Sequence, residues 1–230
     1  NHAPRRLDAR RPAQPLVERQ LAAARGDGRD APEATLAVQR VLLGLYDRPE
    51  YRGKLIALAG ELYGDGEASF VQHLAVIRAG VGAGAWDLVG AHCTAAAPQA
   101  TAEQYLADYP DGDHTREDAE EAAANREGLL ATYRGWAAAN RGDLDAAERA
   151  FREAKKSLRT TFLGVPGNEL YRYWGQALLM RGDLRAGLEK LTLAALYGGD
   201  AEAEAVAREA FDRLDNPGTF DDYLWQMRQK

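Results

Sequence analysis

The chain has 230 residues, of which 46% are apolar and 8% aromatic, and its formal net charge is −6. This negative balance excludes a whole-chain basic field that would attract nucleic acid or an anionic membrane surface. The single cysteine, Cys93, excludes an internal disulfide and a four-thiolate zinc site, and no apolar run is long enough to span a bilayer.

The first residues differ in composition from the rest of the chain. Residues 1–15 are rich in proline and arginine and show no periodic pattern, so we expect a flexible arm or linker there. The sequence begins with Asn1 and shows no signal peptide. We therefore expect a processed or trimmed product, from which a signal sequence, a lipid-anchored stretch or another domain was removed.

From Leu16 onward, residues 16–230 are interpreted as consecutive pairs of helices. Apolar residues recur at helical intervals, and Gly, Pro, Asp and Asn interrupt them at short spacings. The turns between paired helices are expected at Gly66, Ala97, Gly142, Gly182 and Gly218. The Ala97 turn lacks a glycine, but Pro98 can open the following helix there. The predicted fold class is therefore all-α.

The tetrapeptide Arg-Gly-Asp-Leu marks the two clearest turns, at Arg141–Leu144 and Arg181–Leu184. In each copy the glycine can adopt the left-handed conformation that ends one helix, and the aspartate can cap the next. A turn this short forces two helices antiparallel. The predicted helices are Thr115–Arg141, Leu144–Arg159, Glu169–Met180 and Leu184–Tyr197. Thr115 with Asp118 predicts a capping box at the start of the first of them.

The residues around these turns also match. A glycine lies seven residues before three of these turn positions, at Gly90, Gly135 and Gly175, and a small residue lies five after each of the same three, as at Gly187. Small residues let two helix backbones approach closely, while large ones such as Phe151 fill the adjacent space. Because one pair alone cannot bury its apolar face, stacking of pairs is expected to supply the core.

This pattern of small and large residues resembles the tetratricopeptide repeat, a helix-turn-helix unit of about 34 residues that stacks into a right-handed superhelix. The resemblance is carried best by 84–109, 128–160 and 168–197, and a C-terminal pair follows at 200–229. It implies a right-handed α-solenoid of about five or six helix pairs. The motif is specific for fold and says little about function.

Two segments depart from the standard unit. Residues Thr160–Asn168 are longer than a usual inter-repeat turn, and the helix that starts at Thr115 adds an acidic overhang over 115–128. We expect features specific to this protein in these two places. The stretch Tyr105–Gly112 resembles a helix end and turn common in periplasmic repeat proteins that coordinate envelope assembly. That resemblance favours the periplasm or envelope over the cytoplasm, although the compartment stays open.

Several groups of residues suggest chemistry that their spacing does not support. Arg-Gly-Asp as an adhesion ligand would have to protrude on a mobile loop, whereas two of its copies are expected to form tight caps between helices.

Cys93 with His73, His92 and His114 lacks the spacing of metal ligands, so we expect Cys93 to be an inert thiol in the core. The carboxylates of Asp111–Glu117 lack the calcium-loop pattern. We expect no cofactor, no metal and no enzymatic activity.

The concave surface of such a stack would be lined by the first helix of each pair. The residues expected to face it are Tyr63, Thr132, Trp136, Asn140, Arg172, Gln176 and Met180. Aromatic residues and arginine dominate binding hot spots, so Trp136 and Arg172 predict a peptide-binding patch. The alternative is that the long helix overhang or the next repeat covers Trp136. Only Arg172 and Asn140 could serve a carboxylate clamp, so capture of a chain terminus is not expected.

The sequence thus predicts a non-catalytic scaffold that binds a protein or peptide in its concave groove, with bacterial envelope assembly as one setting. The alternative is a helical accessory or oligomerisation domain cut from a larger sensor, enzyme or transport protein. No nucleic-acid partner and no membrane span are expected, while a lipid anchor or a removed signal peptide stays open. The partner's identity and the oligomeric state do not follow from the sequence.

Overall fold

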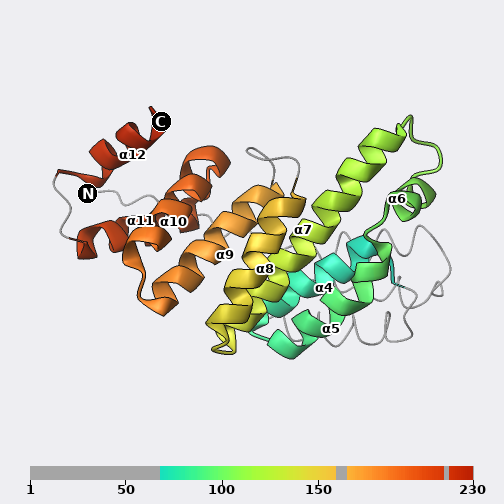
Figure 1. Cartoon of the computed structure of the whole chain (residues 1–230), viewed down its shortest axis with the longest axis horizontal. Helices are drawn as coiled ribbons and strands as arrows, with labels where there is room; N and C mark the ends of the chain where they lie inside the picture. Colours follow the sequence, from blue (N-terminus) through green and yellow to red (C-terminus); the bar gives the residue numbers. More distant parts are fainter. Residues whose placement is uncertain (1–67, 159–164, 215–217, 230) are drawn as a thin grey trace, which may run out of the picture. The chain divides into compact units, whose positions relative to one another are not determined.

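The computed structural model describes residues 68–158, 165–214 and 218–229. Over these ranges the chain forms nine α-helices and one short 3-10 turn with no strand, which confirms the predicted all-α class (Figure 1). Packing divides the chain into two compact units, Asn1–Ala83 and Gly84–Lys230. The expected arm at 1–15 and the predicted site residue Tyr63 lie outside the described residues.

One described helix, α4 (Phe70–Ala83), belongs to the first unit. The second unit contains α5 (Trp86–Ala96), the 3-10 turn η1 (Ala97–Gln99), α6 (Ala102–Asp108), α7 (Arg116–Asn140), α8 (Leu144–Ser157), α9 (Val165–Arg181), α10 (Leu184–Gly198), α11 (Ala201–Arg213) and α12 (Phe220–Arg228). Within the described ranges, none of these helices combines the length and the apolar character needed to cross a bilayer.

The first Arg-Gly-Asp-Leu copy forms the expected tight turn between α7 and α8. Gly142 adopts the left-handed conformation with φ of 86°. Its backbone N–H donates to Ala139 O at 3.0 Å, and that of Asp143 donates to Ala138 O at 3.0 Å. The Asp143 side chain then accepts from the N–H of Ala146 at 2.9 Å. The turn therefore satisfies the last carbonyls of α7 and the first amides of α8 at once.

The second copy repeats this geometry between α9 and α10, with φ of 89° at Gly182. The two helices of this hairpin touch through their backbones. A Cβ added to Gly175 would lie 2.6 Å from Leu191 Cγ and 3.1 Å from the carbonyl oxygen of Gly187. In the first hairpin, Gly135 makes room for the Phe151 ring in the same way. The predicted close approach at these glycines is confirmed.

The expected pair around Ala97 differs from these hairpins. Pro98 lies in η1 and does not open an α-helix, and α6 begins only after that turn. Gly90 has no tight neighbour, since an added Cβ would lie 3.7 Å from Arg141 Nη1. Both α5 and α6 pack against α7, so α7 organises this end of the second unit.

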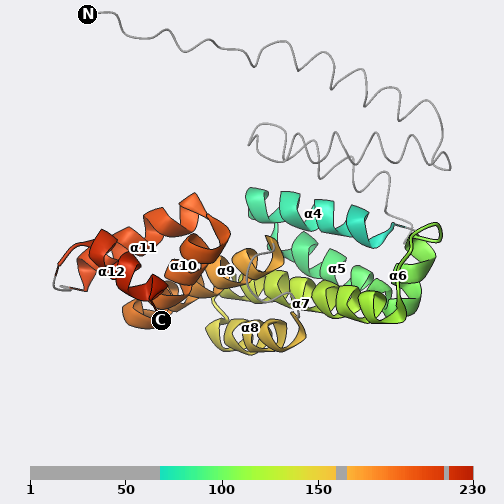
Figure 2. The ribbon, with the colours of Figure 1, turned by 90° about the horizontal axis from the view of Figure 1, so that it is seen from above.

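The long helix α7 begins with the predicted capping box, in which Thr115 and Asp118 exchange hydrogen bonds. The acidic side chains of its first turns are exposed, but the segment is not a free overhang, because α6 lies along it (Figure 2). Buried Arg126 joins the two helices. Its guanidinium pairs with Asp108 at 2.7 Å and donates to the carbonyl oxygen of Gln99 at 2.9 Å.

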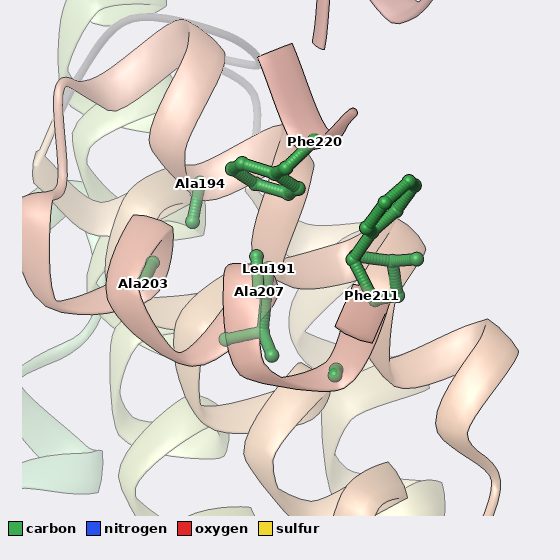
Figure 3. Packing of buried hydrophobic residues seen from close by; sticks show 8 residues of the cluster. Leu191, Ala194, Ala203, Ala207, Phe211 and Phe220 are labelled. Atoms are coloured by element: carbon green, nitrogen blue, oxygen red, sulfur yellow. The ribbon is translucent and has the colours of Figure 1, made fainter. Parts of the chain in front are cut away.

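The C-terminal helices bury a separate apolar cluster with α10. Leu191 and Ala194 of α10 pack against alanines of α11, and Phe211 and Phe220 close the cluster (Figure 3). The two phenylalanine rings meet edge to face at 5.7 Å. Gly218, with φ of 86°, lies just before α12, as the sequence predicts for this turn.

Candidate functional site

Three aromatic rings from α5, α7 and α9 form a continuous row, which we call the aromatic row. Trp136 of α7 stacks on Tyr173 of α9, with ring centroids 4.9 Å apart and planes inclined by 14°. Trp86 of α5 meets Trp136 edge to face at 6.3 Å. Aromatic contacts of this kind contribute about 0.5–1.5 kcal/mol beyond area burial. The row therefore ties three helices together while keeping aromatic surface at their junction.

Trp136 itself is half-buried, so its side chain is neither fully accessible to a partner nor fully covered by neighbouring helices. Tyr173 covers one face of its ring, and the remaining surface is accessible. Asn140 lies one turn further along α7, also half-buried, and its Nδ2 donates to the carbonyl oxygen of Trp136 at 2.9 Å. The amide carbonyl of Asn140 keeps its capacity to accept a hydrogen bond.

Arg172 is occupied within the protein. Its Nη1 pairs with Asp200 at 3.3 Å and Glu202 at 3.0 Å, and its Nη2 donates to the Tyr173 hydroxyl at 3.2 Å. Burial lowers the pKa of the guanidinium, but Tyr173 and the two carboxylates outweigh that effect and raise it overall. Arg172 therefore joins α9 to the start of α11, where Asp200 is the N-cap residue. We assign it a structural role in place of the expected contact to a partner.

The remaining predicted residues differ in accessibility. Thr132 is fully buried, and its hydroxyl donates to the carbonyl oxygen of Gly128 at 2.8 Å, so it cannot touch a partner. Gln176 is half-buried and Met180 is 52% exposed. Both lie on the face of α9 that carries Tyr173, at helical spacings of three and seven residues. The accessible part of the predicted site is thus Trp136, Asn140, Gln176 and Met180.

Sequence reasoning missed a pocket lined by basic residues. A pocket of about 460 Å³ lies between α8, α9 and α10, and four basic residues line it: Arg152, Lys155, Arg181 and Lys190. A partial signal was visible, because three of the chain's five lysines fall at 155, 156 and 190. Their convergence could not be predicted, since it depends on how three helices pack.

The thiol of Cys93 is buried, and burial raises its pKa to about 12. Burial lowers the pKa of the neighbouring His92. A thiol with such a pKa is almost fully protonated at neutral pH and therefore a poor nucleophile. Across residues 68–158, 165–214 and 218–229, no three His, Cys, Asp or Glu side chains come together as metal ligands would.

Comparison with known protein families, with characterised proteins and with solved structures finds no match for this chain. The interpretation of both surfaces therefore rests on their own residues.

Proposed function

We propose that the chain is a non-catalytic scaffold in which tetratricopeptide-like hairpins stack as a right-handed solenoid and bind a protein or peptide along α7 and α9. The observation that carries the proposal is the aromatic row, which places part of Trp136 at the surface between successive hairpins. The hairpins α7–α8 and α9–α10 share one turn geometry and pack side by side, as repeat units would.

The chemistry of the accessible residues suits a peptide. An aromatic ring such as Trp136 provides a large contact area with little conformational entropy to lose, and tryptophan is enriched at binding hot spots. The amides of Asn140 and Gln176 can bond the backbone of an extended segment. Met180 adapts to varied apolar side chains because its thioether is flexible and polarisable.

The test compares partner recovery by quantitative pull-down for the wild type, for the pair Gln176→Ala and Met180→Glu, and for Lys156→Ala. Lys156 is an exposed control on α8 that is separate from this face. The changes at the exposed residues Met180 and Lys156 should each alter stability by no more than about 0.5 kcal/mol. We expect the paired variant to lose partners that the Lys156 control retains. Equal recovery by all three proteins would remove this face as the binding site.

A further inference from the structure

The pocket between α8, α9 and α10 has a charge opposite to that of the chain. Its lining carries four basic side chains, Arg152, Lys155, Arg181 and Lys190, against two carboxylates, Glu148 and Asp183. Two of the cations also have partners outside the lining, since Arg181 pairs with Asp145 at 2.7 Å and Lys190 with Glu189 at 3.5 Å. The whole chain has a formal net charge of −6. A short anionic ligand would therefore be attracted locally, whereas a long polyanion such as nucleic acid would also meet the repulsion of the remaining surface.

Both carboxylates of the pocket are already engaged. Asp183 accepts from the backbone N–H of Ala186 as the N-cap of α10. Glu148 accepts from Trp174 Nε1 at 2.7 Å and from Arg152 Nε at 2.9 Å. The bond to Glu148 holds the buried indole ring of Trp174 in place, so this part of the lining is preorganised, whereas the Arg152 side chain is exposed.

The lysines are the groups best placed for a ligand. Lys190 lies over the Trp174 ring, with Nζ 5.2 Å from the centroid, and its side chain is only 18% exposed. Its contact with Glu189 is long, at 3.5 Å, so the ammonium keeps the capacity to bind a ligand carboxylate. A partly desolvated ammonium of this kind interacts more strongly with a carboxylate than one in bulk water. Lys155 faces the same pocket from α8, and within the described ranges it has no ion-pair partner. Leu178 and Ala186 add apolar lining beside these charges.

We propose that this pocket is a second binding site, for an acidic peptide segment in which a glutamate or aspartate stands next to an apolar residue. The carboxylate pairs with Lys155 and Lys190, and the apolar side chain packs on Leu178 and Ala186. The pocket volume of about 460 Å³ lies within the range of about 300–1,000 Å³ typical of ligand sites.

The test uses the full chain and a fluorescein-labelled peptide of alternating glutamate and leucine, with binding measured by fluorescence anisotropy. The comparison peptide has glutamine in place of each glutamate. Two variants neutralise pocket lysines and preserve their aliphatic stems, Lys155→Met and Lys190→Met. Lys156→Met is the matched control, because Lys156 is exposed on the same helix and is not part of the lining.

We expect the glutamine peptide to bind at least about tenfold more weakly than the glutamate peptide, since its hydrogen bonds are no longer charge-assisted. Each pocket variant should weaken binding about fivefold and reduce its salt dependence, while Lys156→Met binds as the wild type does. Gln176→Ala should also leave this binding unchanged, which separates the pocket from the face of the proposed scaffold function.

Three results would overturn the proposal: no binding of the glutamate peptide by the wild type, equal binding of both peptides, or equal losses in Lys155→Met and Lys156→Met. Thermal melts of each variant accompany the titrations. If Lys190→Met unfolds because it loses its contact with Trp174, the exposed Lys155→Met decides the outcome alone.

Discussion

Replacing Gly175 with alanine tests whether the close approach of α9 and α10 holds the second hairpin together. Gly175 lies in the middle of α9, where alanine is normally the better helix former by about 0.8–1 kcal/mol. On helix propensity alone, the change would therefore stabilise the protein. The packing around Gly175 leads to the opposite expectation.

The added methyl group would meet atoms that cannot move aside easily. It would lie 2.6 Å from Leu191 Cγ, 3.0 Å from the backbone nitrogen of Leu191 and 3.1 Å from the carbonyl oxygen of Gly187. Two of these atoms belong to the backbone of α10, and Leu191 is fully buried in the C-terminal cluster. Overpacking of this kind costs about 1–3 kcal/mol, so after the gain in propensity we expect a net loss of up to about 2 kcal/mol.

Gly90→Ala is the matched control. Gly90 has the same offset from its turn as Gly175, but the nearest atom to an added Cβ is Arg141 Nη1 at 3.7 Å, an ordinary contact. We expect this variant to be more stable than the wild type by about 0.5–1 kcal/mol.

The assay is urea unfolding followed by far-ultraviolet circular dichroism. With a slope of about 2 kcal/mol per molar urea, the midpoint should fall by up to about 1 M for Gly175→Ala and rise for Gly90→Ala. A midpoint for Gly175→Ala at or above that of the wild type would refute the reasoning. Equal losses in both variants would show that the repeat position, and not the local contact, sets the effect.

Two further predictions concern Arg126 and Cys93. Arg126→Met removes the ion pair to the half-buried Asp108, so we expect the free energy of unfolding to fall by about 2 kcal/mol. Amide exchange should become faster in α6 and stay unchanged in α10. Unchanged exchange in α6 would show that the pair does not hold that helix. Native Cys93 should resist iodoacetamide at mildly alkaline pH and react once the chain is unfolded, because burial raises its pKa from the ordinary 9.0 to about 12. The same pKa shift favours the neutral thiol in the folded state. The stability that the neutral Cys93 thiol contributes is therefore present below pH 9.0 and is lost as the pH rises towards about 12. Rapid labelling of the native protein would contradict both statements.

The features predicted correctly from the sequence depend on contacts between residues close in the chain. The turns at Gly142 and Gly182 need a left-handed residue followed by a capping aspartate, and both requirements are visible in four consecutive letters. The capping box of Thr115 and Asp118 is equally local. The all-α class follows for the same reason, since apolar spacing and turn residues are properties of short windows.

The candidate sites depended on contacts between distant segments. Arg172 looks like a binding residue on an isolated helix, but α11 places Asp200 and Glu202 against it. Gly90 and Gly175 are equivalent by offset, yet only the packing of neighbouring helices distinguishes an open glycine from a tight one.

The basic pocket is the clearest case of this kind, because Lys155 and Lys190 come from helices separated by α9 in the chain. Local hydrogen bonding thus defines where the helices start and stop. Which side chains meet, and which stay available to a partner, is set by the packing of helix against helix, and short-range patterns do not encode it.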